Sequence, residues 1–145
     1  MITKLDIEVK NSVFIKAPRA KVYDAFATAE GLDAWFTRGA RVDARPGGTI
    51  LFRWVDWGAE RNINEEAPGR VIEAKRPERF VFEWGRPGEE TTVEIQFEER
   101  EGGTLVKLRE YGFHEIANVV GNAGGWGEAL TLAKFWVEHR IAINR

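Results

Sequence analysis

The chain has 145 residues, with 21 Lys and Arg against 23 Asp and Glu, and its net charge is −2. This length suits one globular domain, and we take residues 1–145 as a single domain. Cysteine is absent, which excludes disulfides and thiol chemistry. No apolar run approaches the roughly 20 residues of a membrane span. The N-terminus lacks a signal-peptide pattern, and the interspersed charges show no basic face for nucleic acid. We expect a cytoplasmic protein.

The N-terminal part of the sequence predicts a strand followed by two short helices. Apolar and charged residues alternate through residues 5–15, as in a half-buried strand. Pro18 suits a helix start, because it has no amide hydrogen to leave unpaired. Apolar residues then recur at helical spacing up to Ala29. Gly31 is expected to break this helix, and the residues after it form a second helical turn that presents Trp35 and Phe36.

From residue 38 onward the apolar pattern changes to a period of two, which predicts strands. The six strand-like segments are residues 38–46, 47–57, 61–77, 78–84, 91–101 and 103–113. Turn signals containing Gly or Pro separate them. Several connections are short, which favours antiparallel hairpins over parallel crossovers.

The C-terminal segment combines a glycine cluster with a long apolar stripe. Residues 121–127 contain four glycines that fit neither a Walker sequence nor a dinucleotide fingerprint. We therefore expect a hinge that allows an abrupt helix start, and not a phosphate loop. The stripe of the following helix consists of Trp126, Leu130, Ala133, Val137 and Ile141. One long helix over a meandering antiparallel sheet is an α+β layer architecture.

Five stretches carry a resemblance to a known family, and they follow one another in its order. They are VFIKAPRAKVYDAFATAEGLDAWF, RPGGTILFRW, GRVIEAKRPERFVFEW, TTVEIQFEEREGGTLVKLREYGF and GGWGEALTLAKFWVE. Together they resemble the START-like, helix-grip (SRPBCC) superfamily, and within it the homologues of the heat-shock chaperone ATPase activator. The resemblance implies a curved antiparallel sheet of about six to seven strands wrapped on the C-terminal helix. It also implies a cavity between them, which the superfamily uses for hydrophobic ligands.

The resemblance departs from the eukaryotic chaperone activators at the N-terminus. Those proteins carry an additional N-terminal domain, whereas this chain begins almost directly with its first strand. A chaperone partner is therefore not the first expectation.

Several classes of chemistry find no support in the residue pattern. Ser12 is the only serine, and no G-x-S-x-G elbow surrounds it. His114 and His139 show neither the H-x-x-x-H nor the H-E-x-x-H spacing of metal ligands. We expect no metal and no cofactor.

Acid–base chemistry stays open through two carboxylates. A period of two places Asp56 on the same strand face as Trp54, and Glu110 on the same face as Leu108. If these faces point toward the helix, both carboxylates look into one apolar interior and could act as general acid or base, with help from His114. Alternatively, they reach water at strand ends or pair with Arg61 or Arg109.

The preferred hypothesis is a binding protein for a small hydrophobic or aromatic molecule, lipid-like or polyketide-like, held between the terminal helix and the sheet. The candidate contacts are Trp35, Trp54, Trp84, Phe113, Trp126 and Leu130. The alternative is that these side chains fill the interior and leave no cavity. A polyketide-cyclase-like or hydrolase-like enzyme and a protein-interaction module are the competing functions, and a homodimer is plausible on general grounds.

Overall fold

The computed structural model describes residues 3–58 and 60–142. In chain order the elements are β1 (Val9–Ile15), α1 (Arg19–Ala27), α2 (Ala29–Trp35), β2 (Arg41–Val42), β3 (Thr49–Trp57), β4 (Ile63–Lys75), β5 (Arg79–Trp84), β6 (Thr91–Arg100), β7 (Gly103–Tyr111) and α3 (Ile116–His139). The six strand segments predicted after residue 38 correspond to β2 to β7, so their number and order are confirmed.

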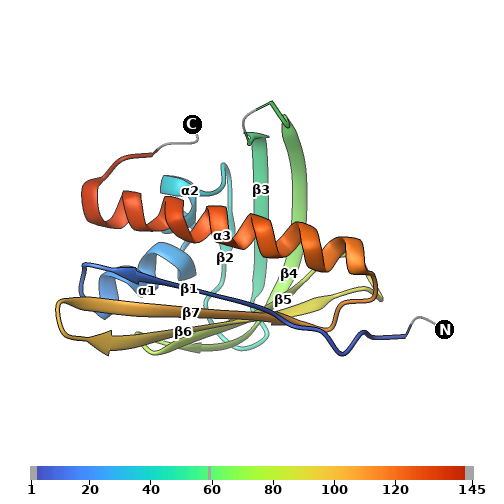
Figure 1. Cartoon of the computed structure of the whole chain (residues 1–145), viewed down its shortest axis with the longest axis horizontal. Coiled ribbons are helices and arrows are strands. Elements are labelled where there is room, and N and C mark those ends of the chain that lie inside the picture. Colours follow the sequence, from blue (N-terminus) through green and yellow to red (C-terminus); the bar gives the residue numbers. More distant parts are fainter. Residues whose placement is uncertain (1–2, 59, 143–145) are drawn as a thin grey trace.

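The strands form one antiparallel sheet in the order β1-β7-β6-β5-β4-β3-β2. Figure 1 shows α3 lying across the sheet, with β3 and β4 rising on one side of the helix and α1 and α2 near its C-terminal end. The predicted α+β helix-grip fold is confirmed. Of the helices in residues 3–58 and 60–142, none combines the length and apolar character that crossing a bilayer requires.

The period-two pattern assigned the inward side of the central strands correctly. Alternate residues along each strand share a face of the sheet, so a run of apolar alternate positions buries one face. The buried apolar residues on the inward side of β5, β6 and β7 are Phe80, Phe82, Val93, Ile95, Phe97, Val106 and Leu108. They pack with α1, α2 and the buried stripe of α3 into one core.

The break between the two short helices lies at Thr28, and the prediction that Gly31 ends the first helix is wrong. The Thr28 hydroxyl accepts a hydrogen bond from the Gly31 amide and thereby caps α2. Gly31 lies inside α2, at a point where α1 approaches so closely that a larger residue would not fit. A Cβ on this residue would lie 2.1 Å from the carbonyl oxygen of Asp24.

The glycine cluster is also placed differently from the prediction. The helix α3 begins at Ile116, so all four glycines lie within a continuous helix and do not form a hinge before it. A Cβ added at any of them would meet no atom within 4 Å, so packing does not require glycine at these positions. At the other end α3 stops at His139, and Ile141 is 50% exposed beyond it.

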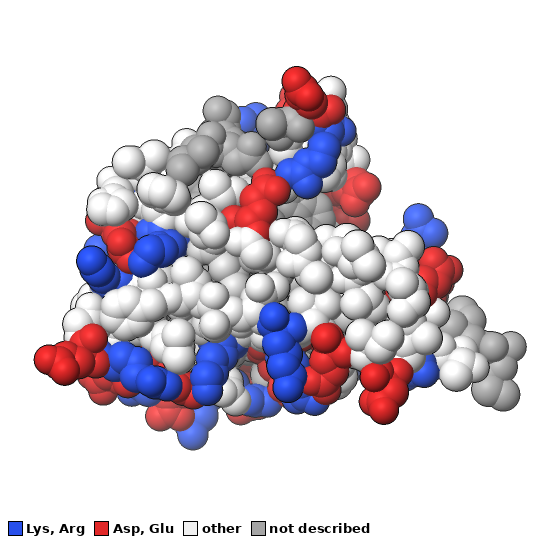
Figure 2. Space-filling model, in the orientation of Figure 1, with Lys and Arg blue, Asp and Glu red and all other residues white. Residues whose placement is uncertain are grey.

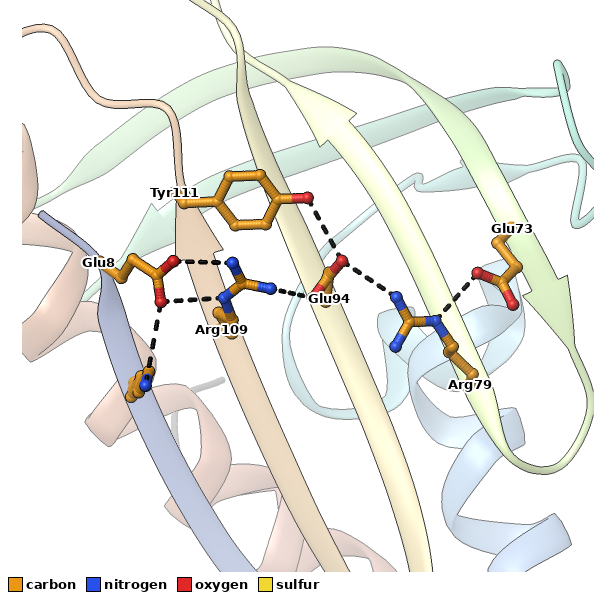
Figure 3. A network of polar contacts seen from close by, with 7 residues as sticks. Glu8, Glu73, Arg79, Glu94, Arg109 and Tyr111 are labelled. Carbon is orange, nitrogen blue, oxygen red and sulfur yellow. Dashed lines mark hydrogen bonds and ion pairs between the residues drawn. The ribbon is translucent and has the colours of Figure 1, made fainter. Parts of the chain in front are cut away.

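The outer face of the sheet carries a chain of ion pairs across four strands and the segment before β1 (Figure 3). Arg109 on β7 donates two hydrogen bonds to Glu8 and one to Glu94, and its guanidinium lies over the Tyr111 ring. Arg79 on β5 bonds Glu94 and Glu73. Hydrogen bonding from Arg109 is the main reason that the pKa of Glu8 is lowered.

Candidate functional site

Glu110, near the end of β7, is the most enclosed charged residue that the structure describes, with 0% of its surface exposed. It faces inward because it follows Val106 and Leu108 at a period of two, on the shared strand face that the sequence indicated. Trp84 and Thr91 donate hydrogen bonds to its Oε2 at 3.0 Å and 2.6 Å. Trp126 donates to Oε1 at 2.8 Å, and Asn122 Nδ2 lies 3.1 Å from both oxygens.

These four partners of Glu110 all act as donors, and an indole N–H can do nothing else. The geometry therefore suits a carboxylate, because both oxygens of Glu110 receive bonds from an indole N–H and the Asn122 amide nitrogen, which can only donate. Among the ion pairs of residues 3–58 and 60–142, none involves Glu110. The buried charge is stabilised by hydrogen bonds, and in return it fixes the positions of two tryptophans.

Above this cluster lies a cleft of about 560 Å³, which we call the His114 cleft. It is lined by Trp54, Glu65, Ala67, Trp84, Gly85, Arg86, Glu89, Thr91, Phe113, His114, Glu115, Asn118 and Asn122. These residues come from β3 to β6, the turn after β5, the segment that leads into α3, and the first two turns of α3 itself. The lining residues thus place the cleft beside the N-terminal half of α3. Figure 1 shows this half of the helix passing over the sheet.

A second hollow of about 200 Å³ adjoins the first, and we call it the Trp57 hollow. It is lined by Phe36, Trp54, Trp57, Arg61, Ile63, Glu65, Trp84, Gly121, Asn122, Gly125 and Trp126. Four of these residues, including Trp54 and Trp84, also line the His114 cleft. The two hollows consequently form one site with a shared tryptophan wall.

The deeper interior is filled by side chains. Around Trp35 the remaining cavity measures about 10 Å³, which is near the lower limit for one water molecule. Trp35 is 2% exposed, stacks on Phe36 at 4.8 Å and donates its indole N–H to the Ala25 carbonyl. Leu130 is likewise 2% exposed within the core. The structure thus places Trp35 and Leu130 in the packed core and the other four candidate contacts along the hollows.

Asp56 does not share the interior with Glu110; the structure places it at the surface, in line with the alternative in which this carboxylate reaches water. A β-bulge between Trp54 and Trp57 shifts the register, and Asp56 adopts a positive φ of 50°. The side chain is exposed and pairs with Asn64 at 3.4 Å. The bulge instead brings Trp57 into the wall of the second hollow. The alternative that the two carboxylates pair with Arg61 or Arg109 is wrong. Arg61 binds Glu128, and Arg109 binds Glu8 and Glu94.

His114 lines the cleft beside Phe113, which is 1% exposed. The Nδ1 atom of His114 is buried and has no hydrogen-bond partner. A buried polar atom without a partner costs free energy, so a rotation of the His114 ring that brings Nδ1 to a ligand group in the cleft would be favoured. Within residues 3–58 and 60–142, no group of three or more His, Asp or Glu side chains could hold a metal ion.

Sequence reasoning missed several residues of the site. Thr91 precedes Val93 by two positions and shares its inward face, so the strand period could have identified it. Asn122 lies one helical turn before Trp126, but the glycines obscured the helix to which it belongs. Trp57 could not have been found, because no local pattern announced the bulge.

Comparison with known families agrees with the resemblance in the sequence. The family described as Activator of Hsp90 ATPase homolog 1-like protein matches residues 16–134. The chain belongs to this family. Comparison with curated protein sequences gives no match.

Solved structures show where the Activator of Hsp90 ATPase homolog 1-like fold recurs. Protein SSP2350 from Staphylococcus saprophyticus is 24% identical, with 94% of this chain and 96% of that chain covered and a TM-score of 0.77. The Aha1 dimer from Colwellia psychrerythraea is 21% identical, with 92% and 97% covered and a TM-score of 0.79. DynU16, from the dynemicin biosynthetic locus, is 16% identical, with 97% of this chain but 51% of that chain covered and a TM-score of 0.82. At these identities the likeness supports the fold alone.

Proposed function

We propose that the chain binds a small hydrophobic or aromatic molecule in the His114 cleft and the Trp57 hollow, between α3 and strands β3 to β5. The observation that carries the proposal is the position of Trp84. Its ring lines both hollows, while its indole N–H is fixed by Glu110 at 3.0 Å. A rigid aromatic wall is typical of small-molecule sites, and the cleft volume of about 560 Å³ lies in their usual range. The rest of the cleft is lined largely by polar side chains, which could bind polar groups of the ligand.

A thermal-shift screen against fatty acids, sterols, flavonoids and polyketide-like aromatics tests this proposal. A ligand at 100 times its dissociation constant stabilises the fold by about 2.7 kcal/mol, which for a domain of this size raises Tm by several degrees. We expect one compound class to raise Tm. A flat response across all classes would contradict the proposal.

The location of the site is tested with two tryptophan variants. Trp84→Phe should weaken binding of the active class about tenfold or more, because the wall loses area and its link to Glu110. Trp136→Phe is the matched control, since Trp136 is half-buried elsewhere on α3. Equal effects of the two variants would place the ligand elsewhere.

A polyketide-cyclase-like or hydrolase-like enzyme is the second candidate. It is supported by the fold shared with DynU16, which comes from a biosynthetic locus, and by His114 in the cleft. Glu110 itself is fully enclosed and engaged by donors, so a substrate would reach it only if Trp84 or Asn122 moved. Turnover of a ligand found in the screen, and its loss in His114→Gln, would support the enzyme, whereas turnover retained in this variant would remove His114 from the mechanism.

Binding of a protein partner is the third candidate function, and the partner considered first is a second copy of this chain. The name of the Colwellia relative describes a dimer. Here the outward side of α3 is almost free of charge (Figure 2), with exposed Ile116 and Val120 near its start. We propose that this side mediates self-association. Sedimentation should detect a dimer that Val120→Glu dissociates, and a monomer at all concentrations would contradict it. Stimulation of a chaperone ATPase is a separate proposal, supported by the family match alone.

A further inference from the structure

We propose that the joined hollows select a ligand that carries an ammonium group on an apolar body. This inference rests on the proposed small-molecule binding and adds the charge of the ligand. It depends on three features of the walls: the aromatic rings, the buried carboxylate behind two of them, and the charges along the rim.

Five aromatic residues line the Trp57 hollow: Phe36, Trp54, Trp57, Trp84 and Trp126. Their rings meet at several angles. Phe36 lies 5.4 Å from Trp54 at 74° and 5.3 Å from Trp57 at 80°. Trp84 and Trp126 stack at 5.5 Å and 27°. The rings that line the hollow are therefore differently oriented. The faces of such rings attract cations, and tryptophan does so most strongly.

Glu110 strengthens this attraction without lining either hollow. The indole N–H groups of Trp84 and Trp126 donate to its two oxygens at 3.0 Å and 2.8 Å. The positive edge of an aromatic ring is thereby bound to a negative charge, which leaves the ring face more negative toward a guest. A cation beside these rings would also feel the buried carboxylate behind them, in a region where screening by water is weak.

The charged groups at the rim are mostly carboxylates. Glu65 lines both hollows, and Glu89 and Glu115 line the His114 cleft. The described ion pairs contain none of these three glutamates. Arg86 is the one guanidinium among the residues that line the cleft.

The other guanidinium beside the site does not offset these carboxylates. Arg61 lines the Trp57 hollow, but Glu128 binds it with two hydrogen bonds at 2.9 Å and 2.8 Å. The site therefore carries excess negative charge, which disfavours a fatty-acid carboxylate and favours a cation.

Three para-substituted phenols, of which the first two are matched in size and shape, test the inference on the full chain. They are (4-hydroxyphenyl)trimethylammonium, its neutral isostere 4-tert-butylphenol, and the anion 4-hydroxybenzoate. Their hydroxyl group can donate or accept, so it suits the unpartnered Nδ1 of His114 in either tautomer. By calorimetric titration we expect the cation to bind about tenfold more tightly than the isostere, and the anion to bind most weakly.

The outcomes separate this inference from the proposed function. Equal or tighter binding of 4-tert-butylphenol would overturn the ammonium preference and leave apolar ligand binding intact. Failure of all three phenols to bind would overturn the inference, while the proposed function would still be decided by the wider thermal-shift screen.

Two neighbouring glutamates on β4 provide matched variants. Glu65 lines both hollows, whereas Glu66 points to the other face of the strand and lies 3.7 Å from Arg53. Glu65→Gln should reduce the preference for the cation over the isostere about threefold or more by weakening the attraction to its charge. Glu66→Gln should leave the preference unchanged. Equal preferences in the two variants would contradict the inference.

Discussion

At the residue scale, Glu110 is a charge that the fold keeps away from water and surrounds with donors. Removing a partner from such an arrangement costs more than the net gain of forming it, because the remaining groups stay buried and unsatisfied. The two indoles, the Thr91 hydroxyl and the Asn122 amide are all arranged for acceptor oxygens. The carboxylate therefore connects the stability of the fold to the geometry of the site.

Glu110→Gln replaces one acceptor oxygen with an amide that can only donate. We expect the free energy of unfolding to fall by about 3 kcal/mol, as measured by chemical denaturation. Glu66→Gln, at an exposed position, should change it by no more than about 0.5 kcal/mol. Similar losses in both variants would show that the donors around Glu110 are not organised by its charge.

On the outer face, the pKa of Glu8 reports the integrity of the ion-pair chain. The hydrogen bond from Arg109 lowers this pKa, and Lys10 makes the smallest contribution. Arg109→Met should therefore raise the pKa of Glu8 toward its ordinary value, and Lys10→Met should raise it less. Carboxyl-carbon NMR titration measures both shifts, and the reverse order would contradict the assignment.

The sign of the stability effect follows from the lowered pKa of Glu8. Its folded-state pKa lies below the unfolded one, so the ion pair stabilises the fold above the unfolded value of about 4.3. This contribution is lost as the pH falls through the folded value. In the Arg109→Met variant, the loss of stability on acidification that comes from Glu8 should therefore be absent.

At the element scale, α3 combines a continuous helix with four glycines that packing does not require. Glycine lowers helix propensity, and Glu115 at the N-cap makes no side-chain capping bond. For these reasons the sequence indicated a loop where the helix already exists. The stripe from Trp126 to Val137 was predicted correctly, because burial against the sheet requires apolar residues at helical spacing. This spacing can be recognised even where the helix propensity is low.

Gly124→Ala should raise the free energy of unfolding by about 0.5–1 kcal/mol, because alanine favours the helix and its Cβ would meet open space. Gly31→Ala is the contrasting variant, since its Cβ would collide with the Asp24 carbonyl oxygen at 2.1 Å and should lower stability. Thermal unfolding of both proteins checks the opposite signs. Destabilisation by Gly124→Ala would mean that the helix needs its glycine.

At the scale of the whole molecule, periodicity was sufficient to predict the order of the strands along the chain and the inward faces of β5 to β7. It also placed Glu110 on the inward face, but it did not decide whether this carboxylate is buried or reaches water. It failed at Asp56, where one bulged residue turns the side chain outward and brings Trp57 inward. It also gave no means of dividing the aromatics between core and cleft. Trp35 and Trp84 both carry inward patterns, and only their three-dimensional packing separates them.

The filled interior and the open hollows lead to the central claim, that a ligand binds beside the core and leaves the core itself undisturbed. The six tryptophans provide a direct test, because each indole N–H gives its own NMR signal. On titration with the tightest binder from the screen, we predict shifts for Trp54, Trp57, Trp84 and Trp126, with Trp35 and Trp136 unchanged. A shift of Trp35 as large as that of Trp84 would contradict the account, because the ligand would then enter the core.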